Sequence, residues 1–180
     1  MQIKTHTNII KILLFLLVAI VALTGCGRNN MNFDFAEVID GENLDDISLT
    51  IYYMEVWTLT PIYVTVEMLR EGWYANRIVV TGNDLKDHIY LFKQINKDTL
   101  IPMRGRPTFS PDIRLYYILE SNINGKLFDV AMWGGRVGMI FNGIEVEANP
   151  IFYDIILPFL PSDMAAHIER ARDAISEDSN

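Results

Sequence analysis

The stretch that decides the fold runs from residue 113 to residue 148 and reads IRLYYILESNINGKLFDVAMWGGRVGMIFNGIEVEA. It contains short runs rich in β-branched and aromatic residues, the composition that pleated strands favour. These runs cover residues 113–121, 127–133, 136–141 and 144–148. Asn-Gly and Gly-Gly pairs separate them and supply the positive φ angles that tight hairpin turns require. The pattern predicts a four-strand antiparallel meander.

Upstream of the meander, residues 47–57 (ISLTIYYMEVW) and 77–81 (RIVVT) have the composition of two further strands. Between these strands, Thr65 as an N-cap and Gly72 as a stop predict a short helix. Apolar residues at helical spacing predict a longer helix from Thr81 onward, with one face formed by Leu85, Ile89, Phe92 and Ile95. Two more helices are predicted after the meander, at 151–157 and 163–175.

These elements predict a single α+β domain over residues 47–176, followed by a frayed tail at 177–180. We expect a mostly antiparallel sheet that ends in the C-terminal four-strand meander and carries its helices on one face. The chain outside its first 25 residues is long enough to bury roughly 68–70% of the surface of its unfolded state. A packed core therefore suffices to hold the fold.

The N-terminus has the pattern of a secretion signal. Lys4 and Lys11 precede an unbroken apolar run of twelve residues at 12–23, and no acidic residue occurs before Asp34. A membrane-spanning helix needs about 20 apolar residues, whereas the apolar part of a signal peptide needs roughly 7–15. The pattern therefore predicts a leader that is cleaved on export.

Leu23, Thr24, Gly25 and Cys26 close this run, and together they resemble the lipobox of bacterial lipoproteins. The resemblance implies that residues 1–25 are a signal peptide and that diacylglycerol is attached to Cys26, the only cysteine. Residues 26–46 are then a lipidated tether. Because two acyl chains anchor a protein stably, the expected location is the extracytoplasmic face of the cell membrane, or of the outer membrane where the envelope has one.

The charge balance excludes some partners. Removal of residues 1–25 takes away Lys4 and Lys11 and no carboxylate, so 13 basic side chains face 23 acidic ones, a balance of −10. An acidic domain is repelled by nucleic-acid backbones and by anionic headgroups. We therefore expect no nucleic-acid partner and a membrane affinity that comes from the lipid on Cys26.

One candidate binding surface lies in the meander. Asp129 and Trp133 share a strand face, and Tyr116 or Arg136 is expected across a neighbouring strand. An aromatic platform beside a carboxylate suits a sugar or a peptide. In the other interpretation, Trp133 packs beneath a helix as part of the core and Asp129 is satisfied at a strand edge.

A second candidate is the irregular segment 96–112, which contains Arg104 and Arg106 among three prolines. Loops longer than about 12–15 residues are usually functional or disordered. Two arginines in an acidic protein suit a carboxylate or another anionic partner. The alternative is a surface connection whose arginines are balanced by nearby acids.

No catalytic, metal or cofactor signature is present. Outside the leader the only histidines are His88 and His167, which lack the HExxH spacing of zinc proteases, and no GxSxG motif occurs. The sequence therefore favours a non-catalytic binding module for a protein, a peptide or a cell-wall component. The alternatives are a cell-wall hydrolase that uses carboxylates and an inhibitor or immunity-type protein whose acidity complements a basic target. The hydrolase requires two carboxylates, or a histidine and a carboxylate, that converge in a cleft.

Overall fold

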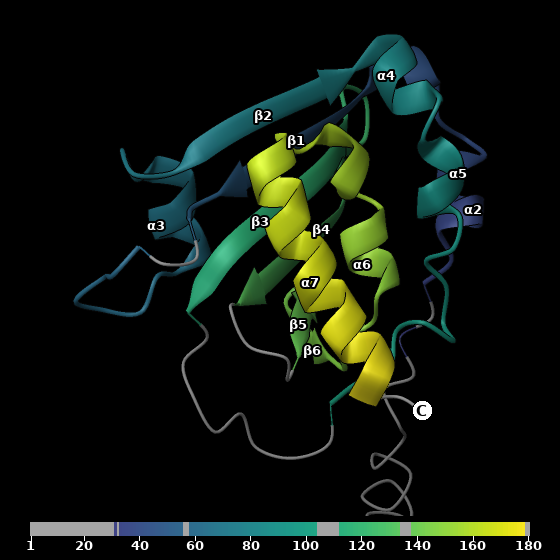
Figure 1. Cartoon of the computed structure of the whole chain (residues 1–180). Coiled ribbons are helices and arrows are strands. Elements are labelled where there is room, and N and C mark those ends of the chain that lie inside the picture. Colours follow the sequence, from purple (N-terminus) through teal and green to yellow (C-terminus); the bar gives the residue numbers. More distant parts are fainter. Residues whose placement is uncertain (1–30, 32, 56–57, 104–111, 134–137, 179–180) are drawn as a thin grey trace, which may run out of the picture. The chain divides into compact units, whose positions relative to one another are not determined.

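The computed structural model describes residues 31, 33–55, 58–103, 112–133 and 138–178. They belong to one compact unit, Met31–Asn180. The described residues form a six-stranded antiparallel sheet in the order β2-β1-β3-β4-β5-β6 (Figure 1). The strands are β1 (Ile47–Tyr53), β2 (Asn76–Thr81), β3 (Ile113–Ser121), β4 (Gly125–Trp133), β5 (Met139–Phe141) and β6 (Ile144–Val146).

The predicted meander is confirmed, because β3, β4, β5 and β6 are neighbours in chain order. Asn142 and Gly143 join β5 to β6 with φ angles of 48° and 79°, as a two-residue type I′ turn requires. The β3–β4 connection is one residue longer than the minimal turn. Gly125 alone has a left-handed φ, of 72°, and it pairs with Ser121. The Gly-Gly pair at 134–135 lies outside the described residues.

Most helices lie on one face of the sheet, where α6 and α7 cross the strands (Figure 1). The helical elements of this layer are α2 (Phe35–Ile39), α4 (Gly82–Lys86), α5 (Ile89–Phe92), α6 (Ile151–Asp154), the 3₁₀ turn η2 (Leu157–Phe159) and α7 (Ser162–Asp178). A second 3₁₀ turn, η1 (Leu44–Asp46), leads into β1. This arrangement confirms the α+β class.

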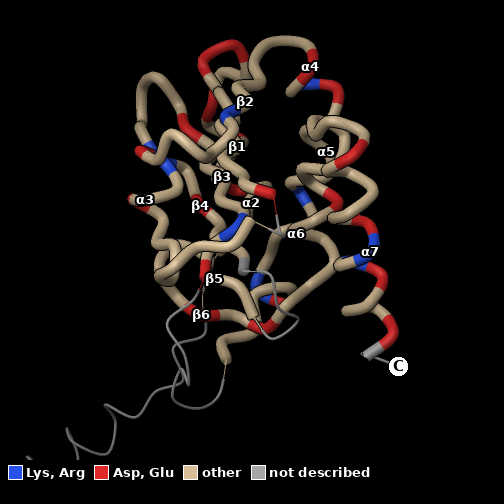
Figure 2. Tube along the Cα trace, turned by 60° about the vertical axis from the view of Figure 1, so that its left-hand side comes forward, with Lys and Arg blue, Asp and Glu red and all other residues tan. Residues whose placement is uncertain are grey.

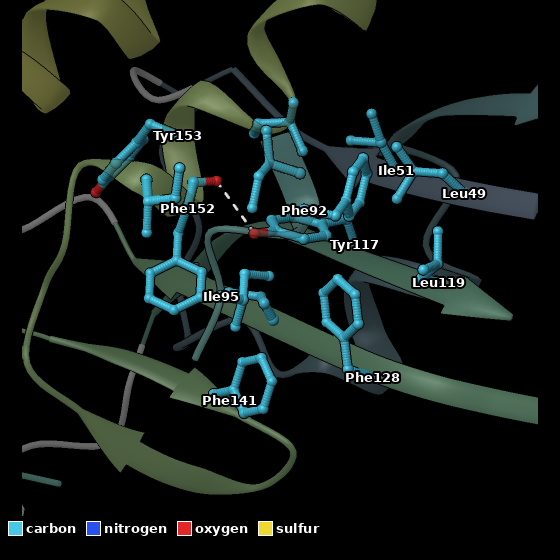
Figure 3. Packing of buried hydrophobic residues seen from close by; sticks show 14 of the residues in the cluster. Leu49, Ile51, Phe92, Ile95, Tyr117, Leu119, Phe128, Phe141, Phe152 and Tyr153 are labelled. Carbon is cyan, nitrogen blue, oxygen red and sulfur yellow. Dashed lines mark hydrogen bonds between the residues drawn. The ribbon is translucent and has the colours of Figure 1, made fainter. Parts of the chain in front are cut away.

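The main core is aromatic and centres on Phe128 of β4. Its ring lies 5.6 Å from Phe141 in a stacked arrangement, and it meets Phe35 edge-on at 5.7 Å. Tyr117 is fully buried beside them and donates its hydroxyl hydrogen bond to the backbone carbonyl of Phe152, at 3.1 Å (Figure 3). A buried tyrosine hydroxyl needs such a partner. This bond therefore ties α6 to the centre of the sheet.

The sheet also has a second, smaller core on its opposite face. Tyr116, Ile118 and Ala131 alternate with the residues of the main core and pack against Leu69 of α3 (Val66–Glu71). The helices are therefore not confined to one face, which corrects that part of the expectation. The cause lies in β3, where apolar residues occupy both parities and need cover on both faces.

The folded unit begins earlier than expected. Residues 26–46 were predicted to be a tether, but α2 lies within that range and its Phe35 is fully buried in the main core. The side chain of Asp34 caps the helix by accepting a 2.9 Å hydrogen bond from the Ala36 amide, and the Phe35 amide donates to the Ile95 carbonyl. A five-residue helix is too short to show periodicity in the sequence.

The single helix predicted after Thr81 is two short helices, α4 and α5, which meet at Asp87 and His88. Its apolar face still forms, since Leu85, Phe92 and Ile95 are buried. At the other end of the chain, α7 continues to Asp178, so helix extends into the tail that was expected to fray from residue 177.

The aromatic core provides a first test. Phe128→Ala removes the ring at the centre of the main core and should cost about 3–5 kcal/mol of unfolding free energy. Tyr117→Phe keeps the ring and removes only its hydrogen bond, so about 0.5–1.5 kcal/mol is expected. Urea unfolding followed by circular dichroism measures both. The exposed Ile123→Ala serves as the control, and equal losses for Phe128→Ala and this control would contradict the packing.

Candidate functional site

The structure brings together two of the predicted site residues. The Tyr116 hydroxyl donates to Oδ2 of Asp129 at 3.1 Å, and Lys126 Nζ contacts Oδ1 of the same carboxylate at 3.1 Å. The backbone on either side is also paired. The Asp129 amide donates to the side-chain oxygen of Asn142, and the Asn142 amide donates to the Asp129 carbonyl, both at 3.0 Å. This cluster links β3, β4 and the β5–β6 turn.

The polar groups of this cluster are already satisfied. Both carboxylate oxygens of Asp129 have a partner, and Tyr116 is only 3% exposed. Burial, and then the charge and hydrogen bond of Asp129, raise the pKa of the Tyr116 hydroxyl, so it remains a donor at neutral pH. Asp129 was expected to be satisfied at a strand edge; its carboxylate is satisfied, but on β4 in the interior of the sheet.

The other predicted site residues are not placed. Arg104, Arg106, Arg136 and Cys26 lie outside the described residues, and of Trp133 only the backbone is described, at the end of β4. Whether these residues form a binding surface with Asp129 remains a prediction.

A different surface stands out at the edge of the sheet. Strand β2 pairs with β1 on one side, and no described strand pairs with its other side. The opposite edge, at β6, is covered. Residues 101–103 run along it, with Pro102 bridging to Val146 and the Met103 amide donating to the Glu145 carbonyl at 3.0 Å. One edge of the sheet is therefore closed and the other is open.

A hollow of about 430 Å³ follows the open edge. Its β2 side is formed by Ile78, Val79, Val80 and Thr81, and the rest of its lining comes from Asp84, Asp87, His88, Pro158 and Phe159. Val79 is 52% exposed although it is apolar and lies within a strand. Strand β2 contains neither proline nor a bulge, two of the features that protect an edge from pairing, and Arg77 is its one charged residue.

A second hollow, of about 270 Å³, lies at the beginning of the same strand. It is lined by Tyr53, Glu55, Asn76, Pro161, Asp163, Met164 and His167. The second hollow contacts β2 at its first residue, Asn76, and the first hollow contacts it from Ile78 onward. Both hollows therefore lie along β2. We call them together the edge groove.

The edge groove is acidic. Among its lining residues are Asp84, Asp87, Glu55 and Asp163, and no lysine or arginine is among them. Arg170 contacts His167 of the second hollow, and the two basic residues next to the groove residues in the sequence are engaged elsewhere. Lys86 pairs with Asp45 at 2.5 Å, and the Arg77 guanidinium lies 5.8 Å from the Tyr52 ring centroid on the other face. Acidic residues recur along α7 in Figure 2. A cationic ligand complements this lining.

The two histidines of the groove hold opposite tautomers when neutral. His88 Nδ1 lies 2.9 Å from the Asp84 carbonyl, which only accepts, so Nδ1 carries the proton and Nε2 is left as the acceptor. His167 Nδ1 instead accepts from Arg170 at 3.3 Å, so its proton is on Nε2. Burial, and then the Arg170 charge, lower the pKa of His167. It is therefore an uncharged ring at neutral pH.

The second hollow comes nearest to the pair of groups that a hydrolase would require. Glu55, Asp163 and His167 all line it. Burial raises the pKa of Tyr53, and the charges of Asp163 and Glu55, which line the same hollow, raise it further. Within the described part of the chain, no group of three or more His, Cys, Asp or Glu side chains has the geometry to hold a metal ion.

Sequence reasoning missed the edge groove because its parts come from distant segments. Glu55 follows β1, whereas Asp163 and His167 begin α7 more than a hundred residues later. Only the position of His88 at the edge of an apolar helix face, and the unprotected sequence NRIVVT of β2, were visible signals.

The pKa of His167 can be tested directly. Arg170→Gln removes one of the two causes of the lowered pKa, so the pKa should rise part of the way towards its usual value. The unfolded chain binds the His167 proton more tightly than the folded one, so acidification below about pH 6.5 should also reduce stability. An NMR titration of the imidazole ring measures the shift. Glu169→Gln is the control, and an unchanged pKa in Arg170→Gln would contradict the contact.

Comparisons with known proteins supply no functional assignment for this chain. None of the described helices is both long enough and apolar enough to cross a membrane. No family model, curated protein or solved structure matches the chain.

Proposed function

We propose that this chain is a lipid-anchored protein of the extracytoplasmic face of a bacterial membrane, and that it binds an extended cationic peptide segment of a partner along β2 without catalysing a reaction. The observation that carries the binding role is the open edge of β2 inside an acid-lined groove. The lipobox-like sequence that ends at Cys26 supports the location.

Strand addition explains how such a groove binds. The outer side of β2 offers backbone amides and carbonyls to an incoming strand, which supplies affinity independent of sequence. The six residues of β2 match a partner segment of about six residues, or about 20 Å. Alternate side chains of that segment enter the hollows, where the partly buried Ile78 offers apolar contact.

Charge then selects the partner. Two carboxylates line each hollow, so basic side chains on the incoming strand gain an ion pair at either end of β2. Acidic segments are repelled by the same groups. The inhibitor or immunity-type alternative is compatible with this groove, since its target would present the basic segment.

The hydrolase alternative also has an observation in its favour, namely the second hollow with Glu55, Asp163 and His167. In that case a wall saccharide or peptide would be cleaved there, and Asp163→Asn would abolish turnover while leaving peptide binding at the first hollow intact. Turnover of cell-wall fragments by the wild type is the result that would favour this alternative.

The anchoring is tested by Cys26→Ala. Without the thiol no lipid is attached, so the protein should be released from membranes or remain unprocessed with its leader. Membrane fractionation and mass spectrometry of the protein from its native host give the answer. Asn29→Ala, outside the lipobox, is the control. Retention of Cys26→Ala at mature size and wild-type level would refute the lipid anchor.

The binding role is tested with synthetic peptides and the mature protein in detergent. A fluorescent hexapeptide of alternating lysine and valine should bind, and the double variant Asp84→Lys/Asp87→Lys should weaken binding by about tenfold or more. The matched control Asp40→Lys/Asp98→Lys makes the same charge change at exposed sites outside the groove.

A peptide with the same side chains but with alternate backbone amides methylated separates strand addition from simple charge attraction. It should bind weakly, because methylated amides cannot pair with β2. Equal affinity of the two peptides, or equal loss in both charge variants, would reject binding at the edge groove.

A further inference from the structure

The segment that leads into α3 exposes apolar side chains on an uncharged stretch of chain. Residues 57–66 read WTLTPIYVTV and contain no charged side chain. Within the described part, Leu59 is 97% exposed, Ile62 61% and Tyr63 59%. Trp73, which follows α3, is 94% exposed. Helix α3 has six residues, about 9 Å, so the segment and Trp73 flank one short helix (Figure 1).

The base of this segment is held firmly. Arg114, whose side chain is 12% exposed, donates to the Thr58 carbonyl at 2.7 Å and to the Thr60 hydroxyl at 3.3 Å. It also pairs with Asp112, whose other carboxylate oxygen accepts from the Val64 amide at 2.9 Å. Both arms of the segment are therefore tied to the start of β3. We call residues 58–63 the apolar loop.

This arrangement presents apolar side chains instead of hiding them. The hydrogen bonds at the base satisfy the Thr58 carbonyl and the Val64 amide, and Leu59, Ile62 and Tyr63 project to solvent. Neither hollow of the edge groove is lined by these side chains. Exposed apolar side chains of this kind suit insertion into a lipid bilayer. Tryptophan and tyrosine prefer the interface between the bilayer and water.

The lipid anchor would keep this loop close to a bilayer. Five residue steps separate Cys26 from Met31, where the folded unit begins, and a fully extended chain spans at most about 18 Å over five residues. Such a short link raises the effective concentration of the domain at the bilayer surface. The acidity of the domain excludes attraction to anionic headgroups, so a contact with lipid must be apolar.

We propose that the apolar loop, together with Trp73, inserts into the interface of the bilayer that holds Cys26 and so fixes the orientation of the domain. This inference rests on the proposed lipid anchor. It adds a second, non-covalent membrane contact, in the way that two weak membrane signals combine into stable attachment. Because the contact is apolar, it does not depend on anionic lipid or on low salt.

The fold supplies a matched control at the far end of the sheet. Ile123, 73% exposed, lies in the β3–β4 turn, and Ser121, two residues earlier, pairs with Ile47 at the start of β1. The apolar loop follows the other end of β1. The seven residues of that strand separate the two sites by about 20 Å, so one orientation cannot place both in the same interface.

The test depends on Cys26 being the only cysteine of the chain, because a cysteine introduced elsewhere can then be labelled selectively. Once Cys26 is lipidated, Leu59→Cys and Ile123→Cys each add a lone free thiol at an exposed site, where substitution does not disturb packing. Each protein is extracted from membranes, labelled with an environment-sensitive fluorophore, and reconstituted into phosphatidylcholine vesicles that contain nitroxide-labelled lipid. Circular dichroism confirms that both variants are folded.

We expect the nitroxide lipid to quench the label at residue 59 several-fold more than the label at 123, equally at low and high salt. Ile62→Asp in the Leu59→Cys background should remove most of this quenching, because a carboxylate is costly in the interface. Weak quenching at both sites in a vesicle-bound protein would overturn the inference and leave the anchor intact, as would equal quenching at both sites. A protein that leaves the vesicles altogether would overturn the anchor and the inference together.

Discussion

The fold depends on burying both faces of strand β3. Its residues alternate between the aromatic core under α6 and α7 and the smaller core under α3, so neither layer of helices can be lost without exposing half of the strand. Arg114 sits at the start of this strand and holds the chain that leads to α3. The centre of the sheet is therefore buried on both faces. The two surfaces proposed to bind partners lie at its periphery, namely the edge groove along β2 and the apolar loop that Arg114 holds.

The parts of the fold that could be predicted are those set by local chemistry. The Asn-Gly turn at 142–143 and the β-branched and aromatic composition of 113–121 and 127–133 act within a few residues, and the meander follows from them. The contact between Tyr116 and Asp129 was predictable for the same reason, since a hairpin determines which residues are diagonal neighbours across its two strands. Helix α2 is too brief for a periodic signal, and the position of α3 on the second face depends on packing that no local pattern reports.

The edge groove could not be predicted from the sequence, because its residues come from segments that only the tertiary fold brings together. Glu55 and His167 share a hollow only because α7 returns across the sheet to the end of β1. The difference between the two edges depends on residues 101–103, which look like an irregular connection in the sequence and act as cover for β6. No segment of the described residues pairs with the outer side of β2 in this way. The asymmetry between the edges is thus a tertiary property, and the proposed binding role depends on it.

The acid lining of the edge groove has a further consequence for how copies of this protein behave at high local concentration. An unpaired edge strand can pair with the same strand of a second copy. Two β2 strands paired in this way would join the two sheets into one continuous sheet. That union would also press the carboxylates of both grooves together in a narrow space. Repulsion between these carboxylates then disfavours pairing of two copies, whereas a positively charged partner can still bind.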